Sequence, residues 1–174
     1  MEAHVIPAAA GFRRRLTVRG AEATFALGAR AAALAAGGGA IVLLHGPLGA
    51  GKTCFCQGFC RALGAGDEVV SPTFTLVNTY PVMPVIHHID FYRIEPGHDL
   101  DDIGVPDLLD EAADGRAVVL AEWPGPLLPA LGALPRIELL VLPGTAPDER
   151  VWHARGVPDL PADWAALFPE DGAC

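Results

Sequence analysis

The sequence is poor in lysine, in amide side chains and in long apolar runs. Of its 12 Lys and Arg residues only Lys52 is a lysine, and Gln57 and Asn78 are its only amide side chains. Acidic residues number 21, so the formal net charge is −9, which excludes the basic footprint of a protein that binds nucleic acid unaided. Glycines interrupt the richest apolar stretch before it reaches the ~18 residues of a membrane-spanning helix. The sequence therefore predicts no membrane segment and no direct binding to RNA.

Cysteine is also scarce, with four residues, of which Cys54, Cys56 and Cys60 crowd together. This crowding is not a spaced disulfide framework, and Arg13–Arg15 are not followed by the apolar segment of a secretory signal. Both observations favour a reducing compartment, the cytoplasm. No second ligand pair accompanies the three cysteines, so buried helix packing is favoured over zinc binding.

What is present is a chain of 174 residues that is 51% hydrophobic, enough for one domain with a substantial core. We expect a domain over residues 1–155 and a C-terminal extension over 156–174, to which the sequence assigns no structure. Helices are predicted over 21–36, 52–63 and 107–113. Strands are predicted over 16–18, 40–44, 73–80, 85–90, 117–122, 136–141 and, more weakly, 151–154. Strands that alternate with helices indicate an α/β fold with a partly parallel sheet.

The segment Gly46-Pro47-Leu48-Gly49-Ala50-Gly51-Lys52-Thr53 matches the phosphate-loop pattern G-x-x-x-x-G-K-[ST] at every fixed position. It lies between an apolar strand and a helix, where the mechanism requires it. Glycines let backbone N–H groups approach phosphate oxygens, a lysine reaches the terminal phosphates, and the hydroxyl of Thr53 can bind Mg²⁺. A glycine-rich turn without function is the less favoured alternative.

Two carboxylates end predicted strands and are candidates for binding the metal or orienting water. Asp90 ends the strand 85–90, and Glu122 ends the strand 117–122. Parallel sheets present ligands at the carboxyl ends of their strands. Either acid could hold Mg²⁺, and the alternative for each is a solvated or helix-capping carboxylate.

Three further features have two readings each. The hydroxyls of Ser71-Pro72-Thr73-Phe74-Thr75 suit a switch that responds to the γ-phosphate, but a turn that enters a strand explains them equally. His87 and His88 are interpreted as strand residues, one facing inward, rather than as ligands. The run 95–114 has eight carboxylates and no Lys or Arg, which is typical of a solvated face and also suits docking of a basic partner.

Taken together, four motifs in this order and at these spacings resemble the TsaE family of small bacterial ATPases required for the threonylcarbamoyladenosine modification of tRNA. They are the phosphate loop, Ser71–Val77 with Tyr80, the segment His88–Arg93, and Glu122-Trp123-Pro124. The resemblance covers about residues 18–155. It implies a single P-loop NTPase domain whose mixed, mostly parallel sheet is flanked by helices. It also implies work with the TsaD–TsaB complex, which modifies adenosine 37 of tRNAs that read codons beginning with A, and contact with tRNA only through that complex.

The resemblance also implies roles for particular residues. Thr53 and Glu122 would hold Mg²⁺, Asp90 would be catalytic with Lys52 and Thr73, and the segment 18–24 would lie near the adenine. The ATP-binding set would be Gly46, Leu48, Gly49, Ala50, Gly51, Lys52, Thr53 and Cys54. Two other functions use the same loop: a nucleotide-dependent assembly factor without significant hydrolysis, and a small-molecule kinase, although no arginine-rich lid is visible for the latter.

Overall fold

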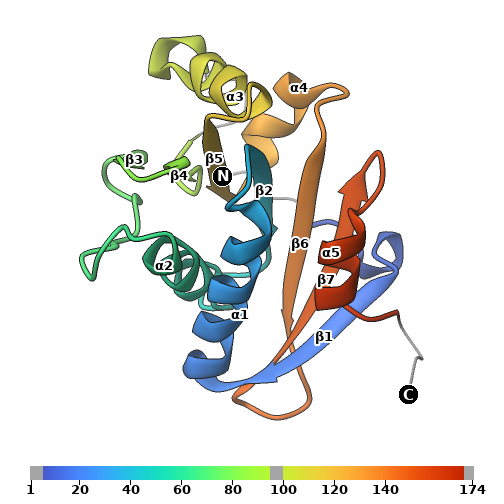
Figure 1. Ribbon diagram of the computed structural model, residues 1–174. Coiled ribbons are helices and arrows are strands. Elements are labelled where there is room, and N and C mark those ends of the chain that lie inside the picture. The colour runs from blue at the N-terminus through green and yellow to red at the C-terminus, as the bar shows by residue number, and fades with distance from the viewer. Residues whose placement is uncertain (1–5, 95–99, 171–174) are drawn as a thin grey trace.

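The computed structural model describes residues 6–94 and 100–170, and its centre is a seven-stranded mixed sheet (Figure 1). The strand order is β1-β7-β6-β2-β5-β4-β3. The four inner strands β6, β2, β5 and β4 run parallel. At one side β7 pairs antiparallel with β6 and β1 pairs antiparallel with β7, and at the other side β3 pairs antiparallel with β4. The strands are β1 (Arg14–Arg19), β2 (Ala40–His45), β3 (Val77–Tyr80), β4 (Val85–Asp90), β5 (Ala117–Glu122), β6 (Arg136–Pro143) and β7 (Glu149–Val157).

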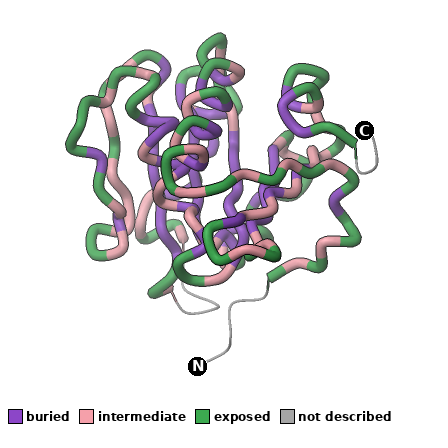
Figure 2. Tube along the Cα trace, turned by 90° about the horizontal axis from the view of Figure 1, so that it is seen from below, coloured by how far each residue is buried: buried purple, intermediate pink, exposed green. Residues whose placement is uncertain are grey.

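Helices cover both faces of the sheet and divide the core into two clusters. The helices are α1 (Gly20–Ala35), α2 (Lys52–Ala62), α3 (Val105–Ala113), α4 (Leu128–Leu131) and α5 (Ala162–Leu167). One cluster joins α1, α2 and α5 to the sheet, and the other joins α3 and α4 to its opposite face. Figure 2 shows the buried residues concentrated along the central strands. The parallel strands are buried on both faces, which explains apolar runs such as Ile41–Leu44.

Helices α1 and α2 pack unusually closely because each contributes a glycine to their contact. A Cβ on Gly28 would lie 2.1 Å from the carbonyl oxygen of Phe55, and one on Gly58 would lie 2.0 Å from that of Phe25. The two backbones can approach this far only without side chains at these positions. The close packing fixes α2, whose first turn carries the end of the phosphate loop.

The structure corrects one predicted strand and extends others. The strand predicted over 73–80 begins only at Val77, because Thr73–Leu76 form a turn. The N–H groups of Thr75 and Leu76 both donate to the Pro72 carbonyl, and Leu76 adopts a left-handed φ of 67°. Conversely, the strand that the sequence predicts only weakly over 151–154 extends over the nine residues of β7, since β7 pairs with both β6 and β1.

The C-terminal segment, which the sequence left unassigned, belongs to the same core. β7 runs to Val157, and α5 follows it. Trp164, Leu167 and Phe168 are buried in the cluster formed by α1 and α2. Among the residues that the structure describes, no helix is long and apolar enough to cross a membrane.

Candidate functional site

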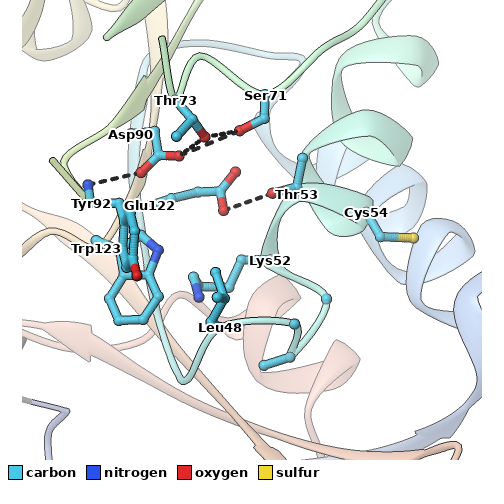
Figure 3. Close-up of a pocket in the computed structure, with 13 residues that line it drawn as sticks. Leu48, Lys52, Thr53, Cys54, Ser71, Thr73, Asp90, Tyr92, Glu122 and Trp123 are labelled. Carbon is cyan, nitrogen blue, oxygen red and sulfur yellow. Dashed lines mark hydrogen bonds between the residues drawn. The ribbon is translucent and has the colours of Figure 1, made fainter.

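A cavity of about 280 Å³ opens where the parallel strands end and α2 begins (Figure 3). The order of the strands explains this position, because β2, β5 and β4 are neighbours and end at the same edge. Loops at such an edge are the usual ligand-binding place of an open α/β sheet. The cavity is lined by Leu48, Gly49, Ala50, Gly51, Lys52, Thr53, Cys54, Ser71, Thr73, Asp90, Tyr92, Glu122 and Trp123.

The phosphate-loop backbone leads directly into α2. Gly49 and Gly51 have φ values of 74° and 107°, in the left-handed region that favours glycine, and Gly51 is the N-cap of the helix. Free N–H groups at a helix N-terminus attract anions, and the helix dipole adds positive potential there. The left-handed glycines and the N-cap give the loop a backbone conformation of the kind in which successive N–H groups form an anion-binding concavity.

Lys52 is buried at this loop with its ammonium group bound to backbone oxygens. Its Nζ donates to the carbonyls of Gly46 and Pro47 at 2.8 and 2.9 Å, and lies 3.8 Å from the ring centre of Trp123. Burial lowers the pKa of Lys52, while Glu122 and Asp90 oppose that effect. A buried ammonium near two acids supplies a positive charge to an anion that enters the cavity.

Glu122 and Asp90 lie beside each other, because they are register partners at the ends of β5 and β4. Both are buried, at 2% and 5% exposure. Glu122 accepts a hydrogen bond from the Thr53 hydroxyl through Oε2 at 3.0 Å, and its Oε1 lies 2.9 Å from Nε2 of His88. The acid at the end of β5 is thus tied to the first turn of α2.

Asp90 is bound by the segment 71–75, for which the sequence left a switch and a simple turn equally open. The Thr73 hydroxyl donates to its Oδ2 at 2.6 Å, and Ser71 approaches the same oxygen at 3.4 Å. Its Oδ1 accepts the backbone N–H of Tyr92 at 2.9 Å. The Asp90 carboxylate is joined to the turn 71–75 by the hydroxyls of Ser71 and Thr73, while the Asp90 backbone N–H donates to the Leu76 carbonyl at 3.0 Å. A ligand or water molecule can replace the hydroxyl bonds at low cost.

Trp123 is a pocket residue to which the sequence motif assigned no role. Its φ of 55° is unusual for a bulky residue, and its ring also packs against Tyr92 with a centroid distance of 5.1 Å. This backbone conformation turns the indole over Lys52, as Figure 3 shows. A left-handed tryptophan has no sequence signature, so only the structure could reveal this contact.

Of the predicted site residues, all but Gly46 line the cavity. A Cβ on Gly46 would lie 2.4 Å from the Val141 carbonyl, so this glycine allows close packing against β6. Cys54 lies at the margin, and its thiol donates to the Ala21 carbonyl at the start of α1. Figure 3 shows its sulfur pointing away from the two carboxylates. The catalytic, nucleotide and metal roles of these residues stay predictions.

Other predicted features are also placed by the structure. Cys56 and Cys60 are buried on α2, which confirms the packing interpretation for these two, whereas Cys54 is only half-buried. Both His87 and His88 are buried rather than one alone. Of the acidic run, residues 95–99 lie outside the described residues. The carboxylates of Asp101, Asp102, Asp107, Asp110 and Asp114 belong to exposed residues, as expected of a solvated face.

The fold and the phosphate loop define an α/β protein of the P-loop NTPase class. A crystal structure of YdiB from Bacillus subtilis matches 89% of this chain and 92% of its own with a TM-score of 0.64 at 28% identity. The family model described as "Threonylcarbamoyl adenosine biosynthesis protein TsaE" matches residues 18–144. The chain therefore belongs to the TsaE family.

Curated relatives carry the same family name, tRNA threonylcarbamoyladenosine biosynthesis protein TsaE. The protein from Treponema pallidum is 41% identical over 85 residues, and that from Bacillus subtilis is 44% identical over 87. These matches span 49% of this chain and only 60% and 51% of the two relatives. The protein from Mycobacterium leprae is 38% identical over 117 residues, which span 64% of this chain and 72% of that protein.

Proposed function

We propose that this protein is a Mg²⁺-dependent cytoplasmic ATPase that supports the TsaD–TsaB complex in forming N6-threonylcarbamoyladenosine at position 37 of tRNAs that read codons beginning with A. One observation carries the ATPase part: Lys52, Thr53, Asp90 and Glu122 converge on one cavity at the end of the parallel strands. Family membership supports the tRNA modification, because the relatives are named for that biosynthesis. The free thiols of the described cysteines suit a reducing compartment.

The donor atoms beside the loop fit magnesium. The Thr53 hydroxyl and a Glu122 carboxylate oxygen lie 3.0 Å apart, and hard oxygen donors are the ligands that Mg²⁺ prefers. These two residues would hold the ion together with phosphate oxygens of the nucleotide. When bound by these residues, the ion would supply positive charge opposite the charge that develops on the phosphates.

The phosphate loop binds the nucleotide through its backbone and through Lys52. The N–H groups of the loop and of the first turn of α2 receive phosphate oxygens. The Lys52 ammonium, which donates to two carbonyls in this structure, exchanges those neutral acceptors for the β- and γ-phosphates. The exchange is favourable because charge-assisted hydrogen bonds are about twice as strong as neutral ones.

Asp90 orients the water for hydrolysis. The oxygen of that water attacks the γ-phosphorus while the bond between the γ-phosphorus and the bridging oxygen of the β-phosphate breaks. The protons of the water end on the released inorganic phosphate, and ADP leaves with the bridging oxygen. Thr73 belongs to the turn 71–75 and donates a hydrogen bond to Asp90. Through Asp90, Thr73 therefore connects this turn to the γ-phosphate. Positioning of this kind is the main contribution that proteins make to phosphoryl transfer.

Hydrolysis by the isolated chain is expected to be slow. The two amide side chains are both engaged away from the cavity: Gln57 donates to the Val69 carbonyl and Asn78 to the Val70 carbonyl. Neither lines the cavity, so no side-chain amide positions the water. A partner that orders the turn 71–75 could accelerate the reaction by about 10²- to 10³-fold for one well-placed group.

The mouth of the cavity offers a surface for that partner. Leu48 lines the cavity and is 73% exposed, and Phe74, next to Thr73, is 85% exposed. Exposed apolar side chains at a site are typical of protein interaction surfaces.

The exposed acidic residues of 101–114 are a second docking candidate for a basic partner. With a net charge of −9, this protein reaches tRNA only through the complex.

The test combines labelled ATP with reconstitution of tRNA modification. We expect phosphate release to water that is slow alone and rises with saturating TsaD and TsaB, and modification that requires this protein. Label transferred to a metabolite would instead indicate a kinase, and modification that requires ATP binding without phosphate release would indicate an assembly factor. A gel shift of tRNA by the isolated protein at physiological salt would contradict the indirect contact.

A further inference from the structure

His88 is a buried side chain that touches the candidate site from behind and has no part in the function argued so far. It lies on β4, two residues before Asp90, and its exposed fraction is 0%. Alternation along the strand puts Ile86, His88 and Asp90 on the face that packs against α2. His87 points to the other face, where its Nε2 lies 2.9 Å from Glu111 of α3.

The strand register explains why His88 reaches Glu122. Asp90 pairs with Glu122 and His88 pairs with Leu120, so His88 is one step diagonally behind Glu122 on the same face. Nε2 of His88 lies 2.9 Å from Oε1 of Glu122, while Oε2 of the same carboxylate accepts the Thr53 hydroxyl. Both carboxylate oxygens are thus bound, one from the protein interior and one from the nucleotide side.

The surroundings of His88 determine which ring nitrogen carries the proton. Nδ1 is buried without a hydrogen-bond partner among the residues that the structure describes. A proton there would leave a buried N–H unsatisfied and would turn the lone pair of Nε2 toward a carboxylate oxygen, two penalties at once. Nε2 therefore carries a proton, which it donates to Glu122.

Cys56 also lies beside His88 and Glu122 in the protein interior, but it does not replace His88 as the hydrogen-bond donor to Glu122. The nearest ligand atoms of Cys56, His88 and Glu122 lie within 4.8 Å of one another. Burial raises the pKa of the Cys56 thiol well above its usual value, and the neighbouring Glu122 raises it further. A neutral thiol is a weak hydrogen-bonding group, so the histidine is the strong donor to this carboxylate.

We propose that His88 is a positioning residue that orients Glu122 for the metal. This inference rests on the proposed function, in which Glu122 and Thr53 hold Mg²⁺. By holding Oε1, the Nε2–H group directs Oε2 toward Thr53 and keeps the carboxylate from turning into the interior. Residues that orient metal ligands in this way typically change metal affinity by about 10- to 100-fold when they are replaced.

The test is titration of Mn²⁺, a paramagnetic substitute for Mg²⁺, in the presence of a non-hydrolysable ATP analogue, followed by electron paramagnetic resonance. His88→Leu should weaken Mn²⁺ binding by about 10- to 100-fold and leave metal-free binding of the analogue unchanged. His88→Gln, whose amide N–H reaches the same place as Nε2, should restore most of the affinity. His87→Leu removes an equally buried histidine of the opposite face, and it should bind Mn²⁺ like the wild type.

Two results overturn the inference alone: wild-type Mn²⁺ affinity in His88→Leu, or a His88→Gln variant as weak as His88→Leu. If the wild-type protein binds no Mn²⁺ with the analogue, the proposed function fails and the inference fails with it. A second readout does not depend on how the variants fold. The ¹⁵N resonances of His88 in the wild-type protein should show a proton on Nε2, and a neutral ring protonated on Nδ1 would contradict the proposal.

Discussion

Two groups of buried charged residues in one sheet, one built on Glu138 alone and one on the pair Asp90 and Glu122, have different hydrogen-bond partners. Glu138 of β6 is 1% exposed and receives hydrogen bonds at 2.9 Å from the Nε atoms of both Arg136 and Arg155. Asp90 and Glu122 are equally buried, but their partners are hydroxyls, a backbone N–H and a histidine. The first group is neutralised by the protein's own arginines, whereas the second is not.

The difference indicates which cluster awaits a ligand. Lys52, the cation that lines the same cavity as the second group, is held by neutral backbone carbonyls rather than by the acids. Buried charges are stable when they are paired, so an arginine-paired carboxylate serves the fold. Acids and an ammonium that share a cavity without a direct ion pair among the described residues are suited to a ligand that carries both signs, such as a metal–nucleotide complex.

The largest expected effect comes from Lys52→Ala. The variant loses the only lysine of the chain and leaves the terminal phosphates unpaired in a buried site. We expect ATP affinity to fall about 10³-fold, with thermal stability close to that of the wild type. Equilibrium dialysis with labelled ATP measures the affinity. Retention of wild-type affinity would remove the loop from the mechanism.

Glu138→Ala should have the opposite profile, because it breaks a structural cluster. The substitution removes the common partner of two arginines, and the free energy of unfolding should fall by about 3 kcal/mol. This value is at the low end for a broken buried ion pair, because the Arg155 side chain is 38% exposed and can turn to water. Urea denaturation measures the loss. At urea concentrations where the variant is still folded, its ATP affinity should stay within a few-fold of the wild type. A large loss of affinity would contradict the separation between a structural cluster and a ligand-binding cluster.

Asp90→Asn and Glu122→Gln should distinguish the roles of the two acids in the site. A metal ligand acts in the ground state, so Glu122→Gln should weaken Mg²⁺-dependent ATP affinity. A water-orienting acid acts in the transition state, so Asp90→Asn should lower turnover by about 10²-fold with little change in affinity. Calorimetry and phosphate release on both variants test this, and the reverse order would exchange the two roles.

The smallest effect concerns pH and His45, which ends β2. Burial lowers its pKa to about 4, although Glu138, 3.7 Å from its Nε2, opposes this. Between pH 6.5 and 4 the unfolded state therefore binds more protons at this histidine than the folded state does. The stability that comes from neutral, buried His45 is complete above pH 6.5 and is lost as the pH falls. The free energy of unfolding should drop by about 2 kcal/mol more between pH 7 and 5 in the wild type than in His45→Gln. Equal slopes for both proteins would contradict a buried neutral histidine.

The sequence predicted the parts of the molecule that depend on local patterns. The phosphate loop has a fixed spacing, and the parallel strands are nearly continuous apolar runs, so both were predicted close to their observed positions. The site residues that end β4 and β5 followed from the rule that parallel strands present ligands at their carboxyl ends.

What could not be predicted depends on register or on unusual backbone conformations. The contact of His88 with Glu122 joins residues 34 apart in the sequence, and the bond from Arg155 to Glu138 joins residues 17 apart. Both require the exact pairing of strands. The turn that replaces the start of β3 depends on the left-handed Leu76, and the burial of α5 depends on packing against α1. Local propensity contains no signal for either.

The most direct test of the account is a calorimetric titration of the wild-type protein with ATP, with and without Mg²⁺. We expect saturable binding of one nucleotide that is at least about tenfold tighter with Mg²⁺, since Thr53 and Glu122 then contribute through the metal. Absence of binding, or binding with the same affinity in both conditions, would contradict the claim that these uncompensated acids form a metal–nucleotide site.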